Sequence, residues 1–437
     1  MSVLMKPSGV EWIGDIPTSW TKDKLFRLTD FISSGGTPTS TNPDYYEDGN
    51  ITWIQTGDLN DGYISKTSKK ITQHGLDNSS AKIFNQGTLL IAMYGATIGK
   101  LGIMAVDAAT NQACCAMKYN EKTDTKFMFY IFLAMKTHLI NQSYGGGQPN
   151  ISQDVVKQQY LCFPKYNEQQ AIANFLDKST SQIENAIKTK QAQLKTLETL
   201  KNSIIHKAIT KGLDESVSMK DSWVEWIGEI PEHWTAQMLK RTTSIKGRIG
   251  WQGLTSDEYR TEGKHLLVTG TDFKGRYINW STCHFVDEER YDEDEKIQLI
   301  DKDVLVTKDG TIGKISMAKD MPYPTTLNSG IFVTRPIKND YIQEYMYWIL
   351  ASDMLMEFIE YSKVGSTIAH LYQKTFERFV YPLAPLKEQQ PIVDFLDKEV
   401  EKIDTLKSNV QNQINKLKEY KKSLIYEYVT GKKQVKE

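Results

Sequence analysis

Two long stretches of the chain carry apolar residues at spacings of three and four. The first runs from Glu168 to about Thr210, and the second repeats the pattern after Glu388. Such spacings place the apolar side chains in one stripe along a helix. Gly212 and Gly431 stand where glycine commonly ends a helix. The pattern predicts two helices of roughly 40 residues, each about 60 Å long at about 1.5 Å per residue.

Helices of this length need a partner along the whole stripe, and each long helix offers one to the other. Lys190 and Gln413 interrupt the stripes, so the heptads are imperfect. We expect the two helices to pack as an imperfect antiparallel coiled coil. Antiparallel packing would put the globular parts at opposite ends and relate the two halves by a pseudo-two-fold axis.

The regions between, roughly 20–160 and 235–382, mix strand patterns with apolar-faced helices. The segments ITWIQTGDL, GTLLIAMYG, HLLVTGTDF and DVLVTKDG are typical of strands that end at turns. Residues 126–140 and 341–360 favour helices with an apolar face. Each region is expected to form an α+β domain of about 150 residues with its own core.

Three landmarks occur twice, in the same order, once in each half of the chain. The pairs are EWIGDIPTSW at 11–20 and EWIGEIPEHW at 225–234, TIGK at 97–100 and at 311–314, and EQQAIANFLDK at 168–178 and EQQPIVDFLDK at 388–398. Between the landmarks the halves diverge: SSGGTPTSTNPDYYEDG in the first corresponds to KGRIGWQGLTSDEYRTEG in the second. The chain is therefore two copies of one architecture, with a common frame and different filling.

The expected fold class is α+β, with two globular domains joined by the two long helices. The predicted segments are a first domain with its EWIG segment at 1–165, a first long helix at 166–212, a second domain with its EWIG segment at 213–385 and a second long helix at 386–437.

The composition is that of a globular protein without a strongly charged surface. The 437 residues are 40% hydrophobic and 24% charged, with a net charge of −1. This excludes a uniformly basic surface and leaves room for a local basic face. The chain starts without an apolar signal segment and has no run of about 18 apolar residues. We therefore expect a cytoplasmic protein without a membrane span.

Cysteine usage agrees with a reducing compartment. Cys114, Cys115, Cys162 and Cys283 form no CxxC pair. We expect small buried core residues and no metal site.

The runs GATIGK at 95–100 and GTIGK at 310–314 resemble phosphate-binding loops only superficially. A P-loop needs GxxxxGK followed by Ser or Thr, whereas these runs are shorter and are followed by Leu101 and Ile315. An ATP site is therefore not expected. Two interpretations remain: a tight turn after a strand, or backbone amides and a lysine that hold a DNA phosphate.

Other basic, polar and aromatic residues on predicted loops are candidates for nucleic-acid contact. The loop 145–150 (GGGQPN) and its counterpart 365–367 allow close approach of a ligand or simply turn the chain. The acidic run DEERYDEDE at 287–295 should face away from a duplex. The candidate DNA-binding residues are Lys66, Lys69, Lys70, Thr97, Lys100, Gln148, Asn150, Lys246, Arg248, Trp251, Lys274, Arg276, Lys308, Thr311 and Lys314.

Each EWIG segment carries two tryptophans, Trp12 and Trp20 in the first and Trp226 and Trp234 in the second. They either pack on their own domain or form a protein-docking surface that is used twice.

No catalytic set is recognisable. Asn42 to Tyr45 resembles the NPPY tetrapeptide of amino-methyltransferases, but the second proline is missing and no FxGxG-like loop for S-adenosylmethionine follows a strand. HExxH, GxSxG and a Cys/His pair in a suitable context are also missing from the sequence. We predict no catalytic residues.

Two variable domains, each led by EWIGxIPxxW and separated by repeated EQQxIxxFLDK helices, resemble the specificity subunit of a type I restriction-modification system. The resemblance covers essentially the whole chain, and GRIGWQGLTSDEY looks typical of one type of target recognition domain. It implies that each domain reads one half of a split site in double-stranded DNA. It also implies that the helices set the spacing and bind two modification subunits.

The resemblance further implies partners that hold the cofactors and perform the reactions. The modification subunits would methylate adenine with S-adenosylmethionine, and restriction subunits driven by ATP and Mg would cut DNA, so this chain would bind none of these cofactors. Two alternatives remain: an adenine methyltransferase in its own right, and a coiled-coil adaptor without a DNA role.

Overall fold

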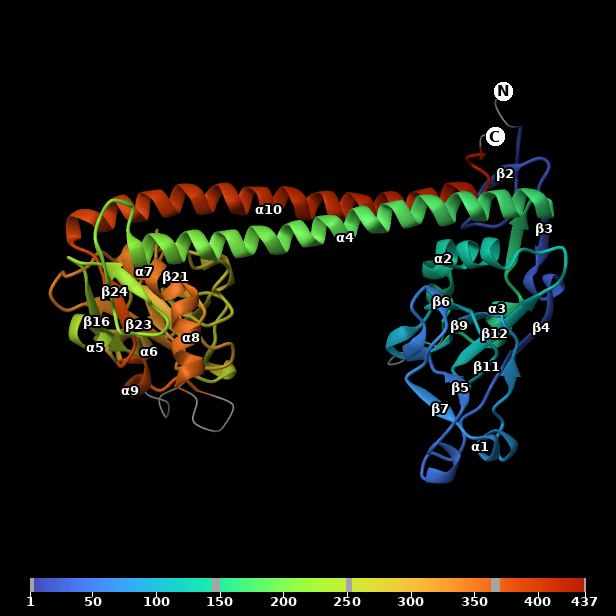
Figure 1. Cartoon of the computed structure of the whole chain (residues 1–437), viewed down its shortest axis with the longest axis horizontal. Helices are drawn as coiled ribbons and strands as arrows, with labels where there is room; N and C mark the ends of the chain where they lie inside the picture. Colours follow the sequence, from blue (N-terminus) through green and yellow to red (C-terminus); the bar gives the residue numbers. More distant parts are fainter. Residues whose placement is uncertain (1–3, 144–149, 249–253, 363–369, 436–437) are drawn as a thin grey trace. The chain divides into compact units, whose positions relative to one another are not determined.

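The computed structural model describes residues 4–143, 150–248, 254–362 and 370–435. The chain divides into two compact units: the first comprises Met1–Gln191 and Asn412–Glu437, and the second comprises Ala192–Gln411. The first unit thus contains the first domain, the start of the first long helix and the end of the second. The second unit contains the end of the first long helix, the second domain and the start of the second long helix (Figure 1).

Two mixed sheets build the first domain, in the orders β4-β12-β9-β10-β6 and β7-β5-β11-β8. Their strands are β4 (Thr29–Ser34), β5 (Ile51–Ile54), β6 (Gly62–Ile64), β7 (Lys69–Ile71), β8 (Ile83–Phe84), β9 (Leu89–Ala92), β10 (Leu101–Met104), β11 (Ala108–Thr110) and β12 (Cys114–Tyr119). Strand β9 is buried at every residue, which fits an uninterrupted apolar strand with a neighbour on each side.

Smaller elements complete the first unit. Strand β1 (Met5–Pro7) pairs with β2 (Asp15–Pro17), and β3 (Thr21–Lys24) pairs with β13 (Tyr160–Phe163). The helices of the domain are α1 (Gln73–Asp77), α2 (Thr125–Asn141) and α3 (Gln153–Lys157).

The second domain has sheets of order β17-β23-β20-β21 and β19-β18-β22. Their strands are β17 (Thr243–Lys246), β18 (His265–Val268), β19 (His284–Val286), β20 (Val304–Thr307), β21 (Ile315–Met317), β22 (Thr325–Leu327) and β23 (Ile331–Pro336). Two strand pairs accompany them: β14 (Met219–Asp221) with β15 (Glu229–Pro231), and β16 (Thr235–Met238) with β24 (Val380–Leu383). The helices are α5 (Leu239–Thr242), α6 (Glu288–Asp292), α7 (Gln343–Ala351), α8 (Asp353–Tyr361) and α9 (Gln373–Phe376).

The predicted short elements are confirmed, with one difference. The four strand segments form β5, β9, β18 and β20, and the helix expected at 126–140 is α2. The helix expected at 341–360 is interrupted at Ser352, which has an extended backbone and donates its hydroxyl to Ile349 O at 2.6 Å. A serine that bonds to nearby backbone competes with helix continuation, so two helices form in place of one.

Both long helices are confirmed as α4 (Tyr166–Lys211) and α10 (Leu386–Val429). In the first unit the ring of Phe175 packs against that of Tyr428, with ring centroids 4.4 Å apart. In the second unit Lys201 Nζ lies 2.9 Å from Asp404, and Lys407 pairs with Glu198. Low numbers on one helix meet high numbers on the other, so the packing within each unit is antiparallel, as predicted.

The cysteines lie inside the domains, as expected. Cys114, Cys115 and Cys162 are buried and Cys283 is half-buried. Burial raises the thiol pKa to about 12 for Cys114, Cys115 and Cys283 and to about 11 for Cys162. Among the described residues no three His, Cys, Asp or Glu side chains gather as a metal site would require. Nor does any helix there have the length and apolar character needed to span a bilayer.

Candidate nucleic-acid interface

The first glycine and lysine run is the turn of a β-hairpin. Residues Gly95–Thr97 form a 3-10 turn between β9 and β10, which pair antiparallel. The backbone N–H groups of Ile98, Gly99 and Lys100 donate within the hairpin to carbonyl oxygens at 3.1, 2.8 and 2.9 Å. Because these three amides are already bonded, they are not available to a phosphate.

A hairpin between β20 and β21 carries the second run. Gly313 N donates to Thr307 O and Lys314 N donates to Thr307 Oγ1, both at 2.9 Å. The Thr307 hydroxyl in turn donates to Thr311 O at 2.5 Å. Both runs are therefore turns between two strands, the bonded amides are not available to a phosphate, and the lysine side chains remain candidates.

Packing against a helix explains why both turns keep their second glycine. Gly99 and Gly313 have φ of +72° and +80°. A Cβ at Gly99 would lie 3.1 Å from Lys136 Cγ on α2, and one at Gly313 would lie 2.6 Å from Met356 Sδ on α8. The left-handed backbone and the close approach both favour glycine, so domain structure accounts for this landmark.

The segment that follows each glycine-rich loop runs beside the hairpin. Tyr94 bridges to Asn150, and Ile151 N donates to Met93 O at 2.7 Å. In the second domain Asp309 bridges to His370 in the same way, and its carboxylate also contacts the His370 imidazole within hydrogen-bonding distance. The candidate Asn150 therefore lies beside the turn that carries Thr97 and Lys100.

Two candidates fall outside the described residues, namely Gln148 and Trp251. The loop residues 145–149 and 365–367 fall outside them as well.

Six candidate lysines are exposed and one, Lys100, is half-buried. The exposed ones are Lys66, Lys69, Lys70, Lys246, Lys274 and Lys314. Lys69 and Lys70 lie on the edge strand β7, and Lys246 ends the edge strand β17. Exposed ammonium groups on edge strands and loops meet the requirement for neutralising phosphates.

Arg248 is corrected from a DNA-facing candidate to a structural residue. Its side chain is 1% exposed, Nε donates to Leu327 O at 2.9 Å, and Nη2 donates to Arg290 O at 3.0 Å. It also forms an ion pair with Glu293. Burial lowers the pKa of this guanidinium, while Glu293 acts in the opposite direction.

Two partners of Arg248, Arg290 and Glu293, come from the acidic run, which therefore has a role inside the domain. Arg290 of the same run pairs with Glu258 and with Glu293, each at 2.7 Å. The run 287–295 thus holds part of the second domain together.

Lys308 also faces its own domain. Lys308 is only 8% exposed, and its Nζ lies 5.1 Å from the centroid of the Phe332 ring. The charge is partly balanced by the aromatic face, so the contact with DNA expected for Lys308 is not available in this conformation.

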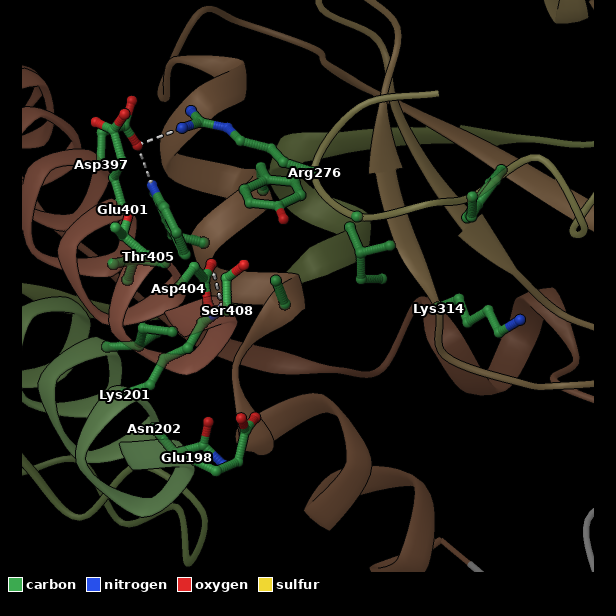
Figure 2. Close-up of a pocket in the computed structure, with 18 of the residues that line it drawn as sticks. Glu198, Lys201, Asn202, Arg276, Lys314, Asp397, Glu401, Asp404, Thr405 and Ser408 are labelled. Atoms are coloured by element: carbon green, nitrogen blue, oxygen red, sulfur yellow. Dashed lines mark hydrogen bonds and ion pairs between the residues drawn. The ribbon is translucent and has the colours of Figure 1, made fainter. Parts of the chain in front are cut away.

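Arg276 joins the second domain to α10. The guanidinium lies 2.5 Å from Asp397, and its central carbon lies 5.2 Å from the centroid of the Tyr347 ring and 5.3 Å from that of Trp348. Figure 2 shows Arg276 directed toward Asp397, whereas Lys314 points away from both. The Arg276 contact is therefore internal, and Lys314 keeps its candidate role.

These residues line a cavity of about 740 Å³ within the second unit (Figure 2). Its floor includes the Lys201 and Asp404 pair. Of its charged groups, Lys201 pairs with Asp404 across the two long helices, and Arg276 pairs with Asp397 between the domain and α10.

The tryptophans pack on their own domains, and for the two that are fully buried this corrects the candidate role in docking. Trp20 and Trp234 are 1% and 0% exposed. Trp12 and Trp226 are half-buried and pack against the same cores. Trp20 and Trp234 are covered and cannot form a docking surface, whereas the half-buried Trp12 and Trp226 remain candidates.

The repeated EQQ…FLDK landmark is the set of side chains that fastens each domain to its helix. Its glutamate accepts from the buried indole: Trp20 Nε1 donates to Glu168 at 3.1 Å, and Trp234 Nε1 donates to Glu388 at 3.0 Å. The EWIG landmark and the helix landmark therefore recur together because they bond to each other.

The first glutamine and the aspartate of the landmark hold the domain helix. Gln169 accepts from Asp124 N at the start of α2, as Gln389 accepts from Ile342 N at the start of α7, both at 2.9 Å. The aspartate of the landmark holds the same domain helix through other side chains. Asp177 accepts from Tyr130 and Lys126 at 2.7 Å, and Asp397 accepts from Trp348 at 2.9 Å and pairs with Arg276.

The segment resembling a methyltransferase tetrapeptide is a local turn. Asn42 Oδ1 accepts from Asp44 N at 3.2 Å, and Pro43–Tyr45 forms a 3-10 turn. The Asn42 side chain acts as the cap of this turn, and this alternative gains no support.

Comparison with known proteins identifies the family. A model described as the type I restriction modification DNA specificity domain matches residues 21–196 and 259–416, more than half of the chain. The specificity subunit of the type I restriction enzyme MjaVIII from Methanocaldococcus jannaschii is 26% identical over 428 residues, covering 96% of this chain and 94% of that protein. The MjaIX specificity subunit of the same organism is 26% identical over 434 residues, covering 97% and 96%.

Solved structures share the fold. A chain from a type I R-M system, studied for its complex assembly and conformational transition, has a TM-score of 0.73 at 16% identity and covers 95% of this chain and 98% of its own. The HsdS subunit from Thermoanaerobacter tengcongensis has a TM-score of 0.53 at 17% identity, with coverage of 95% and 98%. With the family model matching both halves, this chain belongs to the type I restriction-modification DNA specificity family.

Proposed function

We propose that the chain is the non-catalytic subunit that reads DNA sequence in a type I restriction-modification complex. Each domain reads one half of a bipartite, non-palindromic site, and α4 and α10 set the spacing between the halves. One observation carries this proposal: the same EWIG and EQQ…FLDK bonds hold two domains whose remaining sequences differ. Because the two domains are attached to the helices by the same contacts but differ in the rest of their sequences, they read two different half-sites.

The exposed lysines supply the contacts to DNA that do not depend on sequence. Lys66, Lys69 and Lys70 serve the first domain, and Lys246, Lys274 and Lys314 serve the second. Phosphate contacts position a protein on the duplex while other groups read bases. Half-site centres about 10 bp apart would let both readers enter major grooves on one face.

Partners complete the complex in this proposal. Two modification subunits bind the chain and methylate adenine with S-adenosylmethionine, and restriction subunits use ATP and Mg to cut DNA. This chain binds none of these cofactors. Because the ligand is cellular or invading DNA, the complex acts in the cytoplasm.

A domain swap tests the two-reader arrangement. Residues 20–160 are replaced by the same region of another family member, and methylated sites are mapped by genome sequencing. Only one half of the recognised sequence should change. A change in both halves would contradict independent reading.

Two simpler assays test the alternatives. An adaptor without a DNA role predicts no gel shift of the chain with its modification partner on any duplex. A methyltransferase in its own right predicts that the isolated chain binds S-adenosylmethionine.

A further inference from the structure

Among the described residues of the second unit, the most exposed large apolar side chain is that of Trp223, at 89% exposure. It lies in the turn between β14 and β15, and its φ is +59°. This left-handed region is rarely occupied by residues other than glycine, and least by bulky ones. A bulky apolar side chain is thus held in water on an unfavourable backbone.

The first copy shows what the turn itself requires. Strands β1 and β2 pair in the same register as β14 and β15, with Lys6 opposite Ile16 and Lys220 opposite Ile230. The residue at the position of Trp223 is Gly9, with φ of +67°. Glycine satisfies the turn without strain, so the tryptophan has no structural reason to be there.

Neighbouring contacts keep the Trp223 turn ordered. Trp223 N donates to Asp221 Oδ1 at 2.7 Å, and Val224 N donates to Ser222 Oγ at 3.2 Å. Tyr361, itself 69% exposed, packs on Trp226 of the same segment with ring centroids 5.6 Å apart. Tryptophan and tyrosine are enriched among the residues that anchor protein interfaces.

The charge around Trp223 selects the kind of partner. Residues 218–232 carry four acidic residues and one lysine, whereas the corresponding residues 4–18 carry two acidic residues and one lysine. Asp214 and Glu215 precede the segment and are exposed, and Glu215 pairs with Lys207. The lysine, Lys220, is engaged with Glu232 O at 2.6 Å. This acidic surface repels DNA phosphates and, in a two-fold contact, a second copy of itself.

We infer that Trp223 anchors a partner protein whose docking face combines an apolar socket with lysine or arginine side chains, at the second unit only. The inference rests on the proposed function, in which the partner is one of the two modification subunits. The two subunits then bind with unequal affinity, because the first unit presents Gly9 in place of the indole.

The test compares the full chain with Trp223→Gly, which copies the first unit and relieves the strained backbone. Glu232→Thr, which copies Thr18, reports the charge contribution, and Trp223→Phe retains an aromatic anchor. Binding of purified modification subunit is followed by calorimetry, and the number bound is read by native mass spectrometry. Thermal unfolding checks that each variant is folded.

In Trp223→Gly we expect one binding event to weaken at least tenfold, the other to stay unchanged, and Tm to stay equal or rise. Trp223→Phe should bind within a few-fold of wild type, and Glu232→Thr should weaken the same event with less dependence on salt. Two unchanged affinities in Trp223→Gly would overturn the inference. So would the loss of a wild-type homodimer on this substitution, which would identify a second copy as the occupant. If the wild-type chain itself binds no modification subunit, the proposed function fails first.

Discussion

At the residue scale, a few side chains decide how each domain is mounted. Glu168 and Glu388 receive a buried indole, and Asp177 and Asp397 receive donors from the domain. A hydrogen bond to a charged group contributes about 1.5–3 kcal/mol. Both copies use the same motif positions as acceptors. The donor to the glutamate is a tryptophan in both, whereas the donor to the aspartate is Tyr130 in the first copy and Trp348 in the second.

Gly431 is predicted to be essential for the end of α10. It has φ of +72°, and a Cβ there would lie 2.3 Å from Pro17 Cδ. We expect Gly431→Ala to lower the free energy of unfolding by about 2–4 kcal/mol, from backbone strain and a clash with a rigid ring. Chemical denaturation monitored by tryptophan fluorescence measures the loss.

Gly14→Ala is the matched control, because Gly14 has φ of +70° and its nearest neighbour would be Lys432 Nζ at 3.8 Å. It should lose only the backbone contribution, about 1–2 kcal/mol. Equal losses of unfolding free energy in the two variants would mean that the packing of Pro17 on Gly431 does not contribute to stability.

The buried thiols are predicted to be unreactive in the folded protein. A pKa of about 12 for Cys114 and Cys115 leaves very little thiolate at pH 8, because a raised pKa keeps the thiol protonated. A chromogenic disulfide reagent at pH 8 should titrate these two cysteines only after denaturation. Rapid reaction of either one in the native protein would contradict the burial.

At the scale of elements, the spacing of apolar residues predicted the helices, but it did not predict features that depend on hydrogen bonds or on packing between elements. The spacing of apolar residues was enough to predict α2, α4 and α10. It did not reveal the break at Ser352, because a serine hydroxyl bonding to Ile349 O leaves the apolar period unchanged. The glycine and lysine runs were recognisable as turns, but the helix each one packs against was not.

Helix mounting can be tested with Asp177→Ala and Asp397→Ala. Asp397→Ala removes the acceptor of Trp348 and the partner of Arg276, and should destabilise the second unit by about 1–3 kcal/mol. Hydrogen exchange should become faster in α7 and remain unchanged in α2. Asp177→Ala should show the reverse.

Lys398→Ala, at an exposed neighbouring position of α10, is the control and should leave exchange in both helices unchanged. If Asp397→Ala speeds hydrogen exchange in α2 and α7 equally, the contacts that hold α2 and those that hold α7 are not independent.

At the scale of the whole molecule, the proposed role of the long helices as a spacer gives a length prediction. Seven residues are inserted after Gln191 and seven after Gln411, where the chain passes between the two units. Two helical turns add about 10 Å at about 1.5 Å per residue, or about three base pairs at about 3.4 Å each. A seven-residue insertion also approximately preserves the apolar stripe.

Methylation mapping should then find both half-sites unchanged and a longer spacer between them. An insertion in α4 alone, near Lys190, tests whether one helix suffices. A methylated site with an unchanged spacer in the double insertion would rule out the helices as the spacer.

The sequence by itself determined the duplicated plan, the two long helices and the family, because periodicity and repeated motifs are local and survive without knowledge of contacts. Only the tertiary structure decided which charged residues remain at the surface. Arg248 and Lys246 look alike in sequence, yet Arg248 is buried by partners 42 to 79 residues away and Lys246 is exposed. Burial depends on such distant neighbours, and no local pattern encodes them. Trp223 shows the converse: tryptophan side chains are largely buried on average, yet this one is 89% exposed, and its local sequence does not reveal that.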